Sequence, residues 1–474
     1  MNELMRRTMA EQAALVKTGE VAPRELVDAA IGEIERLNPR LNAVVIPMFD
    51  LARDAVKALT GNEPFCGVPM LLKDVLAEYA GAPMTEGSRF LQGYVSPHDS
   101  ELVARYRRAG FIVCGKTNSP EFASKPTTEP ELYGATRNPW DLSRSPGGSS
   151  GGSGAAVAAG MVSVAHANDG GGSTRVPAAA CGLVGLKGTR GRNPFGPDYG
   201  EVGAAGLLSE HVVTRTVLDT ALMLDVSSGP AIGDPFVAPQ PLRPFAAEVG
   251  ADPGRLRIAF SDQPIIDTDV HADCRAAVRD IAALCENLGH FVEEARPQVP
   301  TDNYHRFFTT IWLGMVAWMI RDWERRTGRK AEPQYFEPHT WKMYSVDAQN
   351  RPSDFLLAVQ DMHVFARRVA PFFEHYDVWL TPTLTCPPPP LGWFDFDPEN
   401  PRQATARMEQ YPRFTSLANV TGQPAISLPL CWNDAGLPIG IQCMGRFGDE
   451  AGLLRLAAQL ESARPWAERW PDLT

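Results

Sequence analysis

Residues 145–175 read SPGGSSGGSGAAVAAGMVSVAHANDGGGSTR, and this stretch decides the fold and the chemistry that the sequence predicts. Its glycines fall in two serine-containing clusters, separated by a run of small and β-branched residues. Glycine has no Cβ atom, so it accepts a left-handed backbone and lets another group approach closely. The alanines within 155–159 predict a helix, and residues 162–165 predict a short buried strand. We therefore expect a loop, helix, strand and loop, with Ser149 in the first loop and Ser173 in the second.

The second loop offers a series of unobstructed backbone N–H groups, which belong to Gly170, Gly171, Gly172 and Ser173. An oxyanion hole needs donors that already point to the place where negative charge develops. The loop therefore favours acyl-transfer chemistry in which main-chain amides hold the charge.

A lone lysine stands in an apolar strand candidate upstream of both loops. Lys73 lies within GVPMLLKDVL, residues 67–76. Lysine is almost never buried without a partner, so its side chain either reaches solvent from an edge strand or is buried and functional. The two serine loops that follow favour a buried, functional lysine.

Two short motifs in the chain match well-known patterns. Residues 110–117 fit the nucleotide-binding pattern G-x-x-x-x-G-K-[ST], but the strand candidate 111–114 occupies its variable positions, and amides held in a strand cannot wrap around a phosphate. Residues 147–151 fit G-x-S-x-G, but that nucleophile elbow needs a strand directly before the serine. Turn-forming residues precede it here. We interpret both matches as accidental, while Ser149 remains a catalytic candidate.

The sequence resembles the amidase signature family, serine hydrolases of amides that use a Ser–cis-Ser–Lys triad. GGSSGGS and DGGGSTRVPAAACGLVGLKGTRGR carry the resemblance, and it continues through GKTNSPEF, YGATRNPW, LTPTLTCPPPPLG and FTSLANVTGQPAISLP. The family usually reads GLKPT where this chain has Gly188 after Lys187, a difference outside the triad.

The resemblance implies a role for each of three side chains. Ser173 would be the nucleophile, Ser149, preceded by a cis peptide bond, the bridging serine, and Lys73 the base. The amides of residues 170–173 would form the oxyanion hole. The implied fold is α/β, a central mixed β-sheet covered by helices on both faces, and the alternation of strand and helix candidates along the chain favours the same layers.

A lysine can act as this base only when it is uncharged, and burial favours the uncharged form. Around the triad we expect Ser150 to orient its neighbours, Asp169 to accept loop N–H groups and Arg175 to pair with Asp169. The chemistry needs neither a metal nor an organic cofactor. A Ser-His-Asp triad is left open, because such triads assemble in space rather than in sequence.

The substrate pocket is expected beside a helical, aromatic-rich region at residues 304–373. Most of its aromatic residues should pack between helices, but Trp312 and Trp318 are candidates for the pocket wall. Ser124 and the Gly- and Pro-rich loop 190–206 are further candidates.

Composition limits the alternatives. The 474 residues are expected to form a single domain over 1–474, with its core at about 24–460, and the net charge of −11 argues against binding nucleic acid. The eight cysteines are scattered without a C-x-x-C pair. The first residues lack the apolar run of a signal peptide, and no segment approaches the ~18–20 apolar residues of a membrane span. We expect a cytoplasmic protein that does not contact membranes; a homo-oligomer is left open.

The predicted function is hydrolysis of a non-peptide C–N bond in a small molecule. Within the family, TTEPELYGATRNPWDL, VAHANDGGGSTR and NVTGQPAISLP are most similar to 6-aminohexanoate-cyclic-dimer hydrolases. We therefore expect ω-amino-acid oligomers, cyclic amides or aryl and alkyl amides as substrates. A urethanase that cleaves carbamates with the same triad is the alternative. A glutaminase subunit of an amidotransferase, a nucleotide-binding protein and a non-catalytic binding protein are weaker hypotheses.

Overall fold

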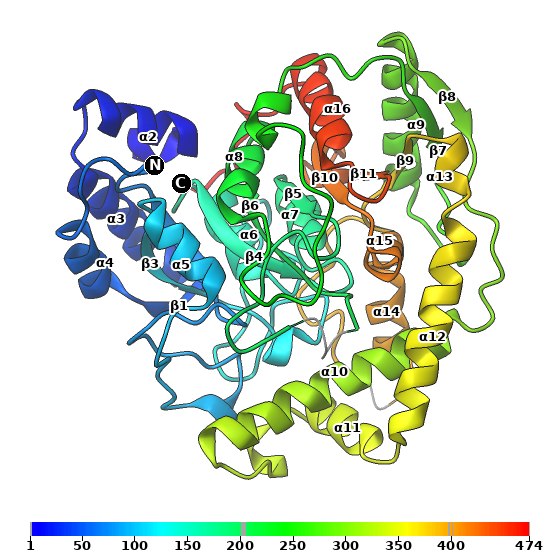
Figure 1. Cartoon of the computed structure of the whole chain (residues 1–474), viewed down its shortest axis with the longest axis horizontal. Helices are drawn as coiled ribbons and strands as arrows, with labels where there is room; N and C mark the ends of the chain where they lie inside the picture. Colours follow the sequence, from blue (N-terminus) through cyan, green and yellow to red (C-terminus); the bar gives the residue numbers. More distant parts are fainter. Residues whose placement is uncertain (1, 201–204, 397–398, 401, 474) are drawn as a thin grey trace.

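The computed structural model describes residues 2–200, 205–396, 399–400 and 402–473, and a single large β-sheet organises them (Figure 1). Its strands are β1 (Val44–Pro47), β2 (Pro69–Lys73), β3 (Ile112–Thr117), β4 (Val164–Asp169), β5 (Val184–Lys187), β6 (Ser209–Thr214), β7 (Arg257–Phe260), β8 (Phe291–Glu294), β9 (Val378–Pro382), β10 (Ala425–Trp432) and β11 (Pro438–Gly445). Within these residues the 11-stranded sheet has the order β1-β3-β2-β4-β6-β5-β10-β11-β9-β7-β8. It is mixed, since β2 runs parallel to β3 and β4 whereas β10 runs antiparallel to β5 and β11.

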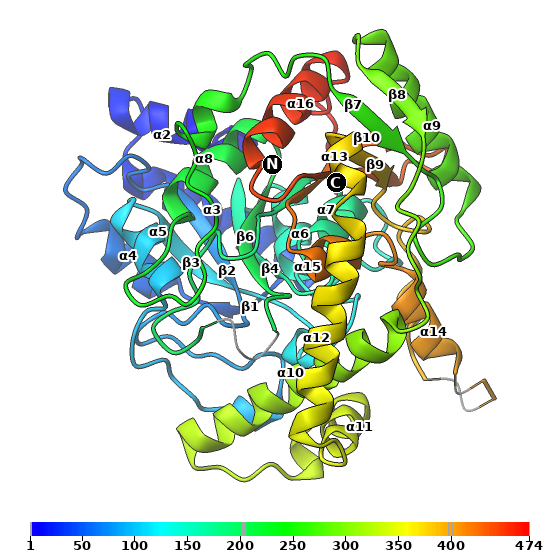
Figure 2. The same ribbon diagram turned by 45° about the vertical axis from the view of Figure 1, so that its right-hand side comes forward.

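Helices cover both faces of this sheet (Figures 1 and 2). They are α1 (Glu3–Arg6), α2 (Met9–Thr18), α3 (Pro23–Leu41), α4 (Phe49–Val56), α5 (Glu101–Arg108), α6 (Gly151–Ala158), α7 (Arg175–Cys181), α8 (Val217–Ser227), α9 (Ala272–Asn287), α10 (Tyr304–Thr327), α11 (Pro338–Asp347), α12 (Pro352–Val369), α13 (Phe372–His375), α14 (Gln403–Gln410), α15 (Ser416–Thr421) and α16 (Glu450–Ala463). Short 3₁₀ turns are η1 (Arg89–Leu91), η2 (Glu121–Ala123), η3 (Phe245–Glu248) and η4 (Pro333–Tyr335). The predicted fold class, a mixed sheet between helical layers, is confirmed.

The alternation of side chains along β2 decides where its lysine points. Met70 and Leu72 pack into one hydrophobic cluster, with residues of α5 and α8, whereas Leu71 packs into another, with residues of α3 and α6. Successive side chains of a strand point to opposite faces, so Lys73 shares the face of Leu71 and α6. Because β2 lies between β3 and β4, Lys73 is on an internal strand and cannot reach solvent from an edge.

The small residues of 151–158 allow α6 to lie close to the sheet. Every residue of this helix is buried. A Cβ atom added at Gly152 would lie 2.5 Å from the backbone nitrogen of Asn118, so no larger residue fits this crossing. Close packing of α6 therefore fixes the loop that precedes it, where Ser149 lies.

The aromatic-rich region 304–373 forms α10, α11 and α12, which group together beside the sheet (Figures 1 and 2). Most of its aromatic side chains fill a hydrophobic cluster, as expected, and Trp323 is fully buried within it. No helix among the described residues combines the length and the apolar character that a membrane crossing requires.

Candidate active site

Lys73 and Ser149 meet in the interior of the molecule. The lysine Nζ lies 2.6 Å from the serine Oγ, and both residues are 0% exposed. The peptide bond between Gly148 and Ser149 is cis, which is the geometry that the resemblance implied. A Cβ atom at Gly148 would lie 2.4 Å from the backbone nitrogen of Thr127, so only glycine fits there. The crowded first loop thus presents its serine hydroxyl to the lysine.

A third side chain, Asn168, completes the surroundings of the lysine amine. Its Oδ1 accepts a hydrogen bond from Lys73 Nζ, and its amide nitrogen donates to the carbonyl of Val75 at 3.3 Å. This residue was not predicted, because the strand expected from the sequence ends at residue 165, whereas β4 continues to Asp169. The available signal was a polar residue two positions before the first glycine of the loop.

Burial changes the charge state of Lys73. Desolvation lowers the pKa of its amine to about 7, although the charges of Glu210, Asp169 and Glu86 act in the opposite direction. Burial disfavours the ammonium because water no longer solvates it. At neutral pH a large share of the molecules therefore carries a free amine, which can accept a proton from the hydroxyl beside it.

Ser173 opens on a cavity of about 360 Å³. It is 8% exposed, and Gly148 and Gly171 lie with it in the cavity wall. The N–H of Ser150 donates to the carbonyl oxygen of Ser173 at 3.3 Å, which joins the two serine loops. The nucleophile candidate is therefore accessible from the cavity, whereas Lys73 and Ser149 are fully buried and do not belong to its wall.

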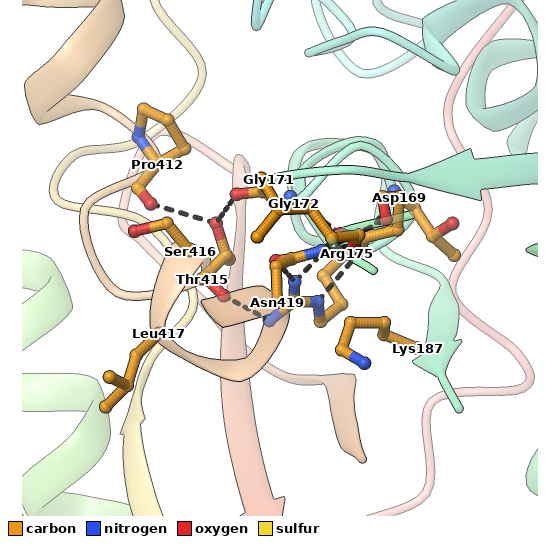
Figure 3. A network of polar contacts seen from close by, with 12 residues as sticks. Asp169, Gly171, Gly172, Arg175, Lys187, Pro412, Thr415, Ser416, Leu417 and Asn419 are labelled. Carbon is orange, nitrogen blue, oxygen red and sulfur yellow. Dashed lines mark hydrogen bonds and ion pairs between the residues drawn. The ribbon is translucent and has the colours of Figure 1, made fainter. Parts of the chain in front are cut away.

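An ion pair anchors the glycine loop from within (Figure 3). The carboxylate of Asp169 accepts hydrogen bonds from the N–H groups of Gly172 and Thr174 and from the guanidinium of Arg175. Burial alone would raise the pKa of Asp169, but Arg175 and the amide of Asn419 outweigh it and lower the pKa to about 2. The carboxylate is therefore charged and fully engaged at neutral pH.

The peptide unit between Gly171 and Gly172 is held at both ends. Thr415 Oγ1 donates to the carbonyl of Gly171 at 2.6 Å, and the N–H of Gly172 donates to Asp169 at 2.7 Å (Figure 3). Gly172 has φ +138°, and a Cβ atom there would lie 2.2 Å from Thr415 Oγ1. The prediction that the amide of Gly172 belongs to the oxyanion hole is therefore corrected, because Asp169 already binds it.

The remaining amides of the loop differ in position. Among the described residues, the N–H groups of Gly170, Gly171 and Ser173 donate to no protein acceptor. Gly171 and Ser173 lie in the cavity wall, whereas Gly170 packs against Leu208 and Trp312. The amides of Gly171 and Ser173 therefore belong to wall residues and have no protein acceptor, so they remain candidates for the oxyanion hole.

The structure separates the two tryptophan candidates. Trp312 on α10 lies in the cavity wall, and so does Ser124, whose hydroxyl donates to the carbonyl of Glu121 at 2.8 Å. Trp318 does not, because its ring packs against Tyr199 with centroids 5.4 Å apart. Trp318 is therefore a packing residue rather than part of the described wall.

Two other predicted site features do not belong to the described cavity wall. Ser150 donates its hydroxyl to the carbonyl of Asn168 at 3.3 Å, between the two serine loops. The predicted pocket loop 190–206 includes residues 201–204, which lie outside the described residues. The part of this loop that the structure describes does not contribute to the cavity wall.

The described part of the chain gives no support for the other chemistries. No histidine within it hydrogen-bonds to either serine; the buried His166 bonds instead to Glu210. The nucleotide-binding pattern at 110–117 overlaps β3, which covers Ile112–Thr117 instead of the predicted 111–114, and its Lys116 is buried 3.8 Å from Asp74. Neither arrangement provides a Ser-His-Asp triad or a phosphate loop.

Comparison with known proteins identifies the class of enzyme to which this fold and site belong. The family model for Amidase matches residues 25–454. The chain is 41% identical to the 6-aminohexanoate-cyclic-dimer hydrolase of Paenarthrobacter ureafaciens, over 98% of this chain and 96% of that protein. It is 37% identical to the putative amidase AmiC of Mycobacterium tuberculosis, over 96% of this chain and 94% of that protein. The chain therefore belongs to the amidase signature family.

Solved structures agree with this assignment. A 6-aminohexanoate cyclic dimer hydrolase complexed with substrate superposes with a TM-score of 0.95 at 40% identity, covering 99% of both chains. A bacterial aryl acylamidase of the amidase signature family superposes with a TM-score of 0.88 at 27% identity, covering 98% of this chain and 97% of that one. The protein is thus a hydrolase that acts on C–N bonds other than peptide bonds.

Proposed function

We propose that this enzyme hydrolyses ω-amino-acid oligomers, cyclic amides or aryl and alkyl amides through Ser173, Ser149 and Lys73. The 2.6 Å contact between the buried Lys73 amine and the Ser149 hydroxyl carries the proposal. Serine is a weak nucleophile unless a neighbouring base takes its proton. An amine with a pKa of about 7 is such a base near neutral pH.

The first step forms an acyl-enzyme. The free amine of Lys73 takes the proton of Ser149, and Ser149 takes the proton of Ser173. At the same time the Oγ of Ser173 bonds to the carbonyl carbon. The negative charge on the substrate oxygen is held by the N–H groups of Gly171 and Ser173. Ser149 then delivers a proton to the amide nitrogen, the C–N bond breaks and the neutral amine leaves, while Lys73 returns its proton to Ser149.

The second step regenerates the enzyme. A water molecule enters where the amine left, gives its proton to the same relay and bonds to the acyl carbon. The oxyanion forms again at the two amides, the ester bond to Ser173 breaks and the serine recovers its proton. The products are a carboxylic acid and an amine, and one water molecule is the only other reactant consumed.

The chemical character of the cavity supports the proposed substrates. Phe308, Trp312, Leu313 and Met343 give its wall a largely apolar surface near Ser173, which suits alkyl chains and aryl rings. The hydrolase relatives named above act on 6-aminohexanoate cyclic dimer by their names. A carbamate differs from an amide by one oxygen at the carbonyl, so cleavage of urethanes is the second candidate.

We further propose that the whole chain, residues 1–474, acts as one catalytic domain on small molecules in the cytoplasm. The eight cysteines are all free thiols in the structure, which suits a reducing compartment. The proposal includes no nucleic acid or membrane partner.

Active-site labelling combined with a substrate panel tests the function. A fluorophosphonate should label Ser173 in the wild type and in Ser124→Ala, but not in Ser173→Ala. The wild type should hydrolyse members of a panel of cyclic amide, linear amide and anilide, and Ser173→Ala none. Hydrolysis of carbamates alone would establish the urethanase instead. A wild type that is not labelled and hydrolyses no member of the panel would contradict the proposal.

A further inference from the structure

Arg413 lies in the wall of the cavity that contains Ser173, yet the protein does not hold its guanidinium in place. Its side chain is only 15% exposed, and its ion-pair partner, Glu409, lies 3.8 Å away, beyond hydrogen-bond distance. The Nε atom is buried without a partner. Among the described residues, no hydrogen bond leaves this side chain.

Other arginines at the same depth behave differently. The side chain of Arg105 is 13% exposed and donates to Glu101 and to four main-chain carbonyls. The side chain of Arg326 is 14% exposed and donates to Glu78 and to two tyrosine hydroxyls. A buried donor without an acceptor costs the free energy of its lost hydration. The unused donors of Arg413 therefore indicate that a bound molecule supplies the acceptors.

The charges around the cavity favour an anion as that molecule. Its wall contains the cations Lys125, Lys342 and Arg413 and a single carboxylate, Glu409. Lys125 is neutralised from behind by Glu337 at 2.6 Å, whereas Glu409 is shared between Arg413 and His305. The described wall is thus net positive in a chain whose formal charge is −11.

We infer that Arg413 binds a carboxylate on the substrate, at the end of an apolar chain that reaches from the scissile amide along the aromatic wall. A planar guanidinium matches a carboxylate with two parallel hydrogen bonds, and an ammonium does not. Linear oligomers of an ω-amino acid carry such a carboxylate, and cyclic oligomers do not. The inference rests on the proposed function and narrows its substrate class to anionic amides.

Matched pairs of substrates test the inference. One pair is adipic acid monoanilide and hexananilide, which places the carboxylate on the acyl side. The other is N-hexanoyl-6-aminohexanoate and N-hexanoylhexylamine, which places it on the amine side. In at least one pair the wild type should favour the anionic member. Arg413→Gln should raise KM for that member about 10- to 100-fold, leave its kcat within about twofold and leave the neutral member unchanged.

Two further variants test whether recognition of the carboxylate needs the guanidinium itself, rather than any positive charge or any arginine in this region. Arg413→Lys should recover only part of the preference, because it keeps the charge but loses the planar fork. Arg402→Gln removes an exposed arginine directly before α14, the helix that precedes Arg413, and should leave the preference intact.

The outcomes distinguish this inference from the function on which it rests. An equal loss on both members of a pair in Arg413→Gln would mean a structural role and overturn it. So would a wild type that hydrolyses anionic and neutral members equally well. If the wild type hydrolyses none of the four substrates, the proposed function falls and the inference falls with it.

Discussion

The two sides of the Ser173 loop contain equally buried ionisable side chains, but their partners are neutral on one side and charged on the other. On the β2 side, the amine of Lys73 meets the neutral oxygens of Ser149 and Asn168. On the α15 side, Asp169 and Arg175 meet as opposite charges (Figure 3). Burial brings the pKa of Lys73 to about 7, whereas the ion pair brings that of Asp169 to about 2. The first side can exchange a proton near neutral pH, and the second holds its charge.

A second lysine shows that a low pKa alone does not make a catalytic base. Lys187 is also buried, and desolvation together with the nearby charge of Arg175 lowers its pKa to about 7. Its amine donates to the carbonyl of Gly188 at 2.6 Å, a group with no proton to give. The partner of the amine therefore distinguishes the two lysines, and replacing each in turn sharpens the comparison.

The largest expected effect follows from replacing these lysines by methionine, an apolar side chain of similar length. Lys73→Met should lower kcat about 10²- to 10⁴-fold, because the serine relay loses its base. Lys187→Met should retain most of the activity, because it leaves the relay intact. Steady-state kinetics on an anilide measure both, with circular dichroism as the check on folding.

The reverse ranking would refute the assignment of the base. If Lys73→Met kept near-normal turnover while Lys187→Met lost it, the proton would have to pass through the α15 side of the loop. If both variants kept their folds and lost activity equally, the contact with Ser149 would not identify Lys73 as the base.

The next effect concerns stability rather than rate. Asp169→Asn removes the negative partner of a fully buried guanidinium and should lower the free energy of unfolding by about 3–5 kcal/mol, because Arg175 keeps its charge without compensation. Lys73→Met removes a charge whose bonded partners are neutral, and should cost clearly less. Urea denaturation of the two variants provides the comparison; a larger loss in Lys73→Met would contradict the division into a fixed and an exchangeable side.

The sequence predicted the fold class and the elements that carry the site because these depend on local patterns. Glycine clusters, an apolar strand with one lysine and a run of alanines are visible within short windows. The internal position of β2 depends instead on the sheet order, which local patterns do not determine. Proline usually ends or kinks a helix, but α3 continues past Pro39 to Leu41, because packing of Leu37 and Leu41 in the core outweighs this local cost.

The parts of the site that were missed are contacts across long distances in the chain. Thr415 and Asn419 reach the glycine loop from 244 and 250 residues away, and no local pattern announces this. The amide of Gly172 was assigned to the oxyanion hole because all glycines in a loop look alike in sequence. Only the position of the Asp169 carboxylate separates it from its neighbours.

The smallest expected effect is a shift in pH dependence. Because the free amine of Lys73 is the proposed base, kcat/KM for a neutral anilide should rise with pH through about 7 and level off above it. Asn168→Asp places a carboxylate beside the amine, favours the ammonium and should move this rise about 1–3 pH units higher. Asn168→Leu removes an acceptor that favours the ammonium and should move the rise lower, by less than about one unit.

Opposite shifts from two substitutions at one position would tie the pH dependence to Lys73, because a general disturbance of the fold would not change sign with the charge of residue 168. Lys187 needs a control, since its pKa is also about 7. In Lys187→Met the rise should stay in place. If Lys187→Met shifted the rise and neither substitution at Asn168 did, the titrating group would lie on the α15 side of the loop. Lys73 would then not be the base.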